Sequence, residues 1–347
     1  MTVARQPYVF CEPFAGSAAL TYWLLGGKPP ISYLGSKQGY ATVIADILGL
    51  SQHHKPAGII LGEPGPFAAV HATLGGASGS AEDVAGWLTC ADLSMKKEPS
   101  CGYGAEYERF ASGARFAPPN MDAVAERVDP ASKAVANIIR SWKDEEPRAL
   151  WERLKKKGWP SLLLPEGCRG RWLGPQSVEE VAGCLLCMDV AFLRGSADSP
   201  GLNTLSLHGG DRDPVVVRLP PKVESLPTFP ALAVWQGVAE DLALPVDLSG
   251  VVIFADPPYA GTTKYKHADC PRETVLRLAR DWSGRGATVA ISEAVRLDRE
   301  LGEGWHAVQI DHARKGQKRT FSKQQDEWVT LNRPPVHVPG KQVGLFG

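Results

Sequence analysis

The sequence lacks the features that would place it in several broad classes. Its 347 residues carry 38 lysines and arginines against 38 aspartates and glutamates, so no net charge attracts or repels nucleic acid. No apolar run approaches the length of a membrane span, and the first residues lack the apolar centre of a signal peptide. We therefore expect an ordinary cytoplasmic protein, in which any site for nucleic acid depends on local clusters of cations.

Cysteine is too scarce and too scattered for a disulfide framework. Seven cysteines, an odd number, are spread along a long chain, so reduced thiols are expected. Cys184 and Cys187 form a C-x-x-C motif, and a zinc site could add Cys168 and His208. The motif lies in an apolar stretch typical of a buried helix, where cysteine is commonly a small core residue. We expect no metal.

The most informative segment is Asp256-Pro257-Pro258-Tyr259, which follows the apolar run 251–255. That run predicts a buried strand, so the tetrapeptide should lie at a carboxyl end, where ligands of open α/β sheets bind. The prolines stiffen the turn and keep Asp256 extended. Carboxylate, carbonyls and an aromatic ring together suit an exocyclic amine on a planar ring. The alternative is a simple proline turn with a half-buried Tyr259.

Two earlier apolar runs also end in an acid. Residues 8–11 predict a strand, followed by the turn Glu12-Pro13-Phe14-Ala15-Gly16-Ser17 and a helix, which lets a ligand approach the backbone closely. Residues 58–62 predict a second strand, and Glu63 after it fits an acid that binds ribose hydroxyls. An exposed strand-end glutamate is the alternative for Glu63. The dinucleotide fingerprint G-x-G-x-x-G is absent.

The pattern of strands and helices predicts an α/β fold in three regions. Residues 1–75 and 229–333 alternate strands and helices, and we expect them to form one discontinuous sheet domain. Residues 76–228 contain short helical stretches separated by glycine, proline and tryptophan, which predicts an inserted, mostly helical domain. Residues 334–347 form a proline-rich tail that should be mobile.

Two local clusters of cations are candidates for contacts with a phosphate backbone. One accompanies tryptophans in the inserted region, and the other lies in the loop 314–323 between two predicted strands. A solvated helix face and a solvated hairpin tip are the alternatives. The candidate DNA-binding residues are Lys155, Lys156, Arg171, Arg314, Lys315, Lys318, Arg319 and Lys323.

Three motifs taken together resemble the adenine-specific DNA methyltransferases of the Dam type. They are the turn 12–17, the segment Tyr33-Leu34-Gly35-Ser36-Lys37 and the tetrapeptide 256–259, and the resemblance covers roughly residues 7–64 and 229–333. It implies a Rossmann-like S-adenosylmethionine-dependent methyltransferase sheet, with the insert as a target-recognition domain. The implied activity is transfer of a methyl group from S-adenosyl-L-methionine to the N6 amino group of adenine in double-stranded DNA.

The resemblance also implies roles for individual residues. A base flipped out of the duplex would stack on Tyr259, while Asp256 and the carbonyl of Pro257 accept hydrogen bonds from its amino group. The implied catalytic residues are Asp256, Pro257, Pro258 and Tyr259. The implied cofactor-binding residues are Glu12, Pro13, Phe14, Ala15, Gly16, Ser17, Tyr33, Lys37, Glu63 and Asp241.

The sequence departs from the family in the order of its motifs. The motif that contains Lys37 usually precedes the turn that contains Phe14, whereas here it follows. Either the segment 33–37 returns to the same place in the fold, or its match is a coincidence. For the acceptor, cytosine N4, adenine in RNA and a glutamine amide are alternatives. A catalytically silent DNA-binding module is an alternative from another class.

The end of the tail resembles a docking peptide. Gln342, Leu345 and Phe346 match the pattern by which bacterial replication proteins bind the sliding clamp. Two large apolar residues in a mobile tail suggest that a partner covers them. The sequence therefore predicts the clamp as a second macromolecular partner beside DNA.

Overall fold

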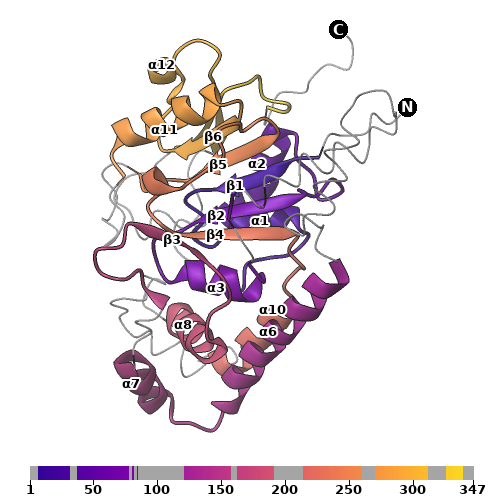
Figure 1. Ribbon diagram of the computed structural model, residues 1–347, viewed down its shortest axis with the longest axis vertical. Helices are drawn as coiled ribbons and strands as arrows, with labels where there is room; N and C mark the ends of the chain where they lie inside the picture. Colours follow the sequence, from indigo (N-terminus) through magenta and orange to yellow (C-terminus); the bar gives the residue numbers. More distant parts are fainter. Residues whose placement is uncertain are drawn as a thin grey trace, which may run out of the picture.

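An eight-stranded mixed sheet lies at the centre of the protein (Figure 1). The computed structural model describes residues 7–31, 37–77, 80–81, 84, 121–157, 162–190, 214–259, 270–311 and 326–338. The strands are β1 (Val9–Glu12), β2 (Gly58–Gly62), β3 (Gly170–Leu173), β4 (Ala231–Gly237), β5 (Val251–Ala255), β6 (Thr288–Glu293), β7 (His306–Asp311) and β8 (Glu327–Leu331).

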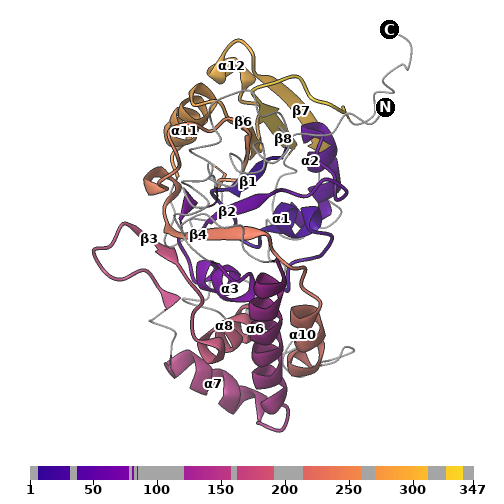
Figure 2. The same cartoon turned by 45° about the vertical axis from the view of Figure 1, so that its right-hand side comes forward.

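Helices cover both faces of this sheet (Figures 1 and 2). The α-helices are α1 (Ala19–Leu24), α2 (Ala41–Leu48), α3 (Phe67–Leu74), α6 (Met121–Ser141), α7 (Pro147–Lys157), α8 (Val178–Val190), α10 (Val215–Glu224), α11 (Arg272–Gly284) and α12 (Asp298–Leu301). Two short 3₁₀ helices, η1 (Lys37–Gly39) and η4 (Ala239–Asp241), lie in connections. No helix among the described residues is both long and apolar enough to cross a membrane.

The order of the strands creates a switch point in the middle of the sheet. The full order is β3-β4-β2-β1-β5-β6-β8-β7, in which neighbours from β4 to β6 pair in parallel. The edge strands β3, β8 and β7 pair antiparallel. The parallel part has the 3-2-1-4-5 arrangement of a doubly wound fold, which reverses between β1 and β5. The predicted α/β class is confirmed, with a mostly parallel sheet compatible with a Rossmann-like fold.

Alternate residues of the central strands enter different cores. Val9 and Cys11 of β1 lie on the face covered by α11, together with Ile253 of β5. Phe10 and Phe254 lie on the opposite face, against α1 and α2. Because both faces are covered, these strands are continuously apolar, which is why their runs were recognisable in the sequence.

The described helices of the region 76–228 share a core with the sheet. Trp151 of α7, Leu185 of α8 and Leu219 of α10 belong to the same buried cluster as Leu232 and Val234 of β4. Figure 2 shows α3 between the sheet and the helices α6 and α8. The strand β3 extends the sheet itself, antiparallel to β4. The described part of this region is therefore packed onto the sheet and contributes a strand to it.

The C-x-x-C motif lies in this shared core. Cys184 and Cys187 are fully buried on α8, and the sulfur of Cys184 lies 3.5 Å from that of Met188. Burial raises the pKa of Cys187 to about 12. His208 lies outside the described residues. Among the residues that are described, no group of three or more His, Cys, Asp or Glu side chains is placed to hold a metal ion.

Candidate functional site at the switch point

The last residue of β1 is a buried acid. The carboxylate of Glu12 accepts a hydrogen bond from the backbone N–H of Thr21 at 3.0 Å, and another from the Thr21 hydroxyl. Burial raises the pKa of Glu12 to about 8, against the effect of the Thr21 hydrogen bonds, and the charge of Asp256 adds to the rise. Glu12 is therefore an acid that a nearby positive charge would ionise at neutral pH.

The turn that follows β1 is tied to the end of β2. The N–H of Ala15 donates to the carbonyl of Gly62 at 2.8 Å, and the N–H of Gly16 donates to the carboxylate of Glu63 at 3.0 Å. A side chain at Gly62 would place its Cβ 2.8 Å from the carbonyl oxygen of Pro13, so only glycine permits this approach. The two turns thus form one unit at the carboxyl edge of the sheet.

Glu63 organises this unit with both of its carboxylate oxygens. One oxygen accepts the Gly16 N–H, and the other accepts the N–H of Gly65 at 3.0 Å. Burial raises the pKa of Glu63, while the two backbone hydrogen bonds lower it. Its position after β2 is the one that the sequence predicted, and its contact with a ribose stays a prediction.

Lys37 and Asp256 meet at the switch point. The Nζ atom of Lys37 lies 2.7 Å from Oδ1 of Asp256 and 3.3 Å from Oε1 of Glu327. The same atom lies 4.7 Å from the ring centroid of Tyr259. The side chain of Lys37 is 7% exposed. Burial raises the pKa of Asp256, and Lys37 opposes that rise through its charge and its hydrogen bond.

The hydroxyl of Tyr259 is fixed by two buried partners. It donates to Glu327 and lies 2.8 Å from the hydroxyl of Ser292, which itself donates to Glu327 at 2.6 Å. Burial raises the pKa of Tyr259 well above its ordinary value, and the charges of Asp256 and Glu327 add to this. The phenol therefore stays protonated, and its ring is held beside Asp256.

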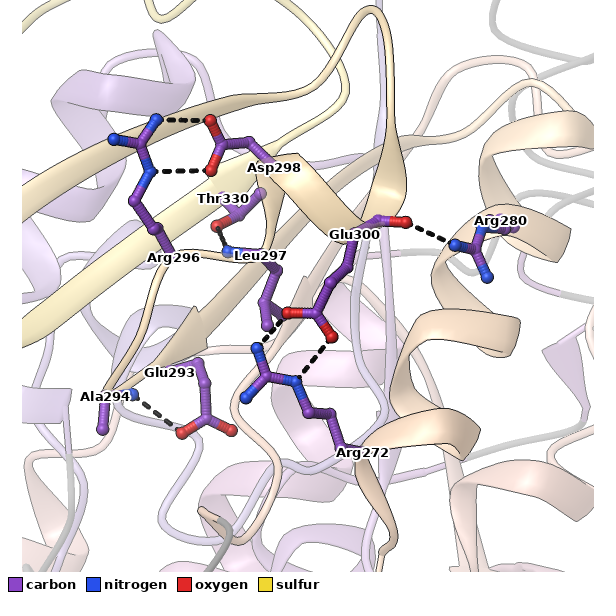
Figure 3. Close-up of polar contacts among 9 residues, drawn as sticks. All are labelled: Arg272, Arg280, Glu293, Ala294, Arg296, Leu297, Asp298, Glu300 and Thr330. Carbon is purple, nitrogen blue, oxygen red and sulfur yellow. Dashed lines mark hydrogen bonds and ion pairs between the residues drawn. The ribbon is translucent and has the colours of Figure 1, made fainter.

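A further buried acid, Glu293, ends β6 and is close enough to Asp256 and Glu327 for their charges to act on it. Its carboxylate accepts the N–H of Ala294 at 2.8 Å. Burial raises its pKa to about 7, while the charge of Arg272 lowers it. Figure 3 shows that the guanidinium of Arg272 is engaged by Glu300, with Nε 2.9 Å from Oε2. Glu293 is thus a second acid that ionises near neutral pH.

Two other predicted residues form contacts within the protein. Asp241, at the end of η4, forms an ion pair with Arg169, in which Nη2 of Arg169 lies 2.9 Å from Oδ1 of Asp241. Arg171 on β3 donates from Nε to Gln236 at 3.0 Å and from Nη2 to the carbonyl of Leu163 at 3.2 Å. Their proposed contacts with cofactor and DNA stay predictions.

Some of the remaining predicted residues lie within the described ranges, and the others lie outside them. Lys155 and Lys156 lie on α7, and Ser17 is buried in the turn after β1. The predicted residues outside the described ranges are Tyr33, Arg314, Lys315, Lys318, Arg319, Lys323, Gln342, Leu345 and Phe346.

Sequence reasoning missed Glu327, Ser292 and Thr21. Glu327 is the first residue of β8, and because β8 is antiparallel to β6, its start lies at the carboxyl edge of the parallel strands. An acid directly before the apolar run 328–331 was the available signal.

No protein-family model and no curated protein matches this chain.

Proposed function

We propose that the protein transfers a methyl group from S-adenosylmethionine to the N6 amino group of adenine in double-stranded DNA. The observation that carries this proposal is the ion pair of Lys37 with Asp256. Lys37 belongs to a motif that stands in an unusual place in the sequence, yet it reaches the catalytic tetrapeptide. If the match of segment 33–37 to the motif were a coincidence, Lys37 would not be expected to lie beside Asp256. The pairing therefore supports the resemblance at the point where the sequence departs from it.

The acids of the switch point suit a cationic cofactor. Asp256 and Glu327 lie within 2.7 and 3.3 Å of Lys37, and the charge of Asp256 also acts on the two further buried acids, Glu12 and Glu293. Four acids against the cations Lys37 and Arg272 support a positively charged ligand. S-adenosylmethionine carries a sulfonium and an ammonium group, and supplies an electrophilic methyl group on a leaving group that departs neutral. The turn 12–17, Glu63 and Asp241 would hold it.

The catalytic residues act by positioning the acceptor. The ring of Tyr259 offers a face on which a flipped base can stack, and its hydroxyl is fixed by Glu327 and Ser292. Asp256 and the carbonyl of Pro257 accept hydrogen bonds from the two N–H groups of the adenine amino group. These bonds turn the nitrogen lone pair out of conjugation with the adenine ring. As the nitrogen forms its bond to the methyl carbon, it loses a proton, which Asp256 can accept.

Lys37 shares Asp256 with the substrate. A carboxylate has about four lone-pair sites, so Asp256 can hold the ammonium of Lys37 and accept from an amino group at the same time. The ion pair fixes the orientation of the carboxylate before the base arrives. This preorganisation lowers the cost of reaching the transition state.

The proposal is tested by analysing nucleosides after incubation with S-adenosylmethionine and unmethylated DNA. We expect N6-methyladenine from the wild-type protein and none from the variant Asp256→Ala. The matched control is Asp298→Ala, because Asp298 is also paired with a cation, Arg296, as Figure 3 shows, but is the first residue of α12 and is not part of the catalytic tetrapeptide. This control should retain full activity.

Other products would redirect the proposal. N4-methylcytosine would keep the fold and change the base, and methylation of RNA alone would change the nucleic acid. Cofactor binding without any transfer to DNA or RNA would favour a glutamine amide or a silent binding module. Activity that survives in Asp256→Ala would refute the assigned catalytic loop.

A further inference from the structure

His71 contacts the turn after β1 from a helix that the proposed mechanism does not use. It lies on α3, where it is buried and stacks on Phe67 with ring centroids 5.8 Å apart and planes inclined by 19°. Its Nε2 atom lies 2.7 Å from the carbonyl oxygen of Gly16. Its Nδ1 atom has no hydrogen-bond partner among the described residues.

The contact fixes the tautomer of the ring. A backbone carbonyl can only accept, so Nε2 of His71 donates, and in the neutral ring Nδ1 carries no proton. Burial lowers the pKa of His71 to about 4, against the effect of the Gly16 contact. At neutral pH the side chain is therefore an uncharged donor aimed at Gly16.

Gly16 is consequently held at both of its backbone groups by buried side chains. Glu63 accepts its N–H, and His71 donates to its carbonyl. Gly16 has a φ of 48°, which glycine adopts readily, whereas Ala18, two residues later, has a φ of 50°, which is unfavourable for a residue with a side chain. A turn in the left-handed region persists only where surrounding contacts determine it. Glu63 and His71 supply such contacts from β2 and α3.

We infer that His71 is a positioning residue that preorganises the turn 12–17 for S-adenosylmethionine. This inference rests on the proposed function and extends it to a residue with no contact to the reacting atoms. A turn already fixed before binding loses less conformational freedom when the ligand arrives. His71 should therefore affect affinity for the cofactor and leave the chemical step unchanged.

The test compares variants at His71 by calorimetric titration with S-adenosylmethionine. His71→Phe keeps an aromatic ring against Phe67 but removes the donor, and we expect affinity to fall about tenfold, the effect of one hydrogen bond. His71→Gln can place an amide donor near the position of Nε2, and should recover most of that loss. The kcat at saturating cofactor should change less than twofold in both variants.

A matched control separates positioning from general stability. Leu74→Ala removes a fully buried side chain from the same helix without altering any group that bonds to Gly16. Hydrogen exchange of the segment 12–18, measured without ligand, should accelerate in His71→Phe and stay at the wild-type rate in Leu74→Ala. This measurement reports on the turn itself and does not need the cofactor.

The outcomes distinguish the two proposals. If the wild-type protein binds no S-adenosylmethionine, the proposed function fails and this role fails with it. If the wild type binds but His71→Phe binds equally well, only the role of His71 is refuted. Equal losses of affinity in His71→Phe and Leu74→Ala would also refute it, because they would show a general effect of stability.

Discussion

Replacing Lys37 by methionine should destabilise the protein in a manner that depends on pH. The change removes the ammonium but keeps most of the volume of the side chain. The side chains of Lys37, Glu327 and Asp256 are 7%, 9% and 21% exposed, so water cannot replace the lost cation fully. Removing one partner of a buried ion pair costs about 3–5 kcal/mol. Because Asp256 is partly exposed, we expect a loss of about 3 kcal/mol at pH 8.

The dependence on pH follows from the pKa of Asp256. Burial raises it, and Lys37 opposes the rise, so loss of Lys37 will raise it further above the unfolded value. A folded state with the higher pKa binds more protons than the unfolded state, and its stability decreases as the pH rises through that pKa. The decrease in the free energy of unfolding caused by Lys37→Met should therefore be smaller at pH 5 than at pH 8.

Urea unfolding of both proteins at pH 5, 7 and 8 measures this effect. The matched control is Arg140→Met, which removes the cation from an ion pair with Glu224 whose side chains are 43% and 33% exposed. Exposed ion pairs contribute little to stability because water screens them, so this control should change little at any pH. A penalty for Lys37→Met below about 1 kcal/mol, or one that is equal at pH 5 and pH 8, would contradict the described network.

Three further predictions concern single buried groups. Glu327→Gln can still accept a hydrogen bond from the hydroxyl of Tyr259 but removes one negative charge beside Lys37, so single-turnover methyl transfer should slow about tenfold and affinity for the cationic cofactor should fall; an unchanged rate would argue against a role in positioning. His71 has a folded-state pKa of about 4, below its unfolded value, so the free energy of unfolding should fall by about 3 kcal/mol as the pH drops from 6.5 to 4. In urea unfolding, His71→Phe should lack this component, and parallel curves for the two proteins would refute the assignment. Glu12, with a pKa of about 8, should release protons when the sulfonium binds at pH 7, as measured calorimetrically in buffers of different ionisation enthalpy. S-adenosylhomocysteine, which lacks the sulfonium, should release fewer, and Glu12→Gln should show less release than the wild type.

The sequence was sufficient for the central strands because their burial leaves a direct signature. The runs 58–62 and 251–255 are apolar on both faces, and each ends at the acid-bearing turn that the structure places at the carboxyl edge. The positions of Glu63 and Asp256 were therefore predictable from local composition. Which strands lie beside β2 and β5 could be predicted only by assuming the doubly wound order of strands.

Contacts between distant segments could not be predicted in this way. Glu327 reaches Tyr259 only because β8 is inserted antiparallel next to β6, and nothing local to either segment specifies that pairing. His71 appears in the sequence as one of two polar residues in a short apolar helix, beside Thr73. Its contact with Gly16 depends on how α3 packs against the sheet, which is a tertiary property.

The hydrogen bonds at the switch point bear on the class of ligand more directly than the fold does. Doubly wound sheets that bind dinucleotides direct N–H groups and a glycine-rich turn at a pyrophosphate, which carries negative charge. Here the N–H of Gly16 is already bound to the carboxylate of Glu63, and the N–H of Thr21 to that of Glu12. An incoming pyrophosphate would meet these carboxylates instead of free donors. Because these donors are already taken, the edge offers few N–H groups to a phosphate, which supports the proposed sulfonium ligand.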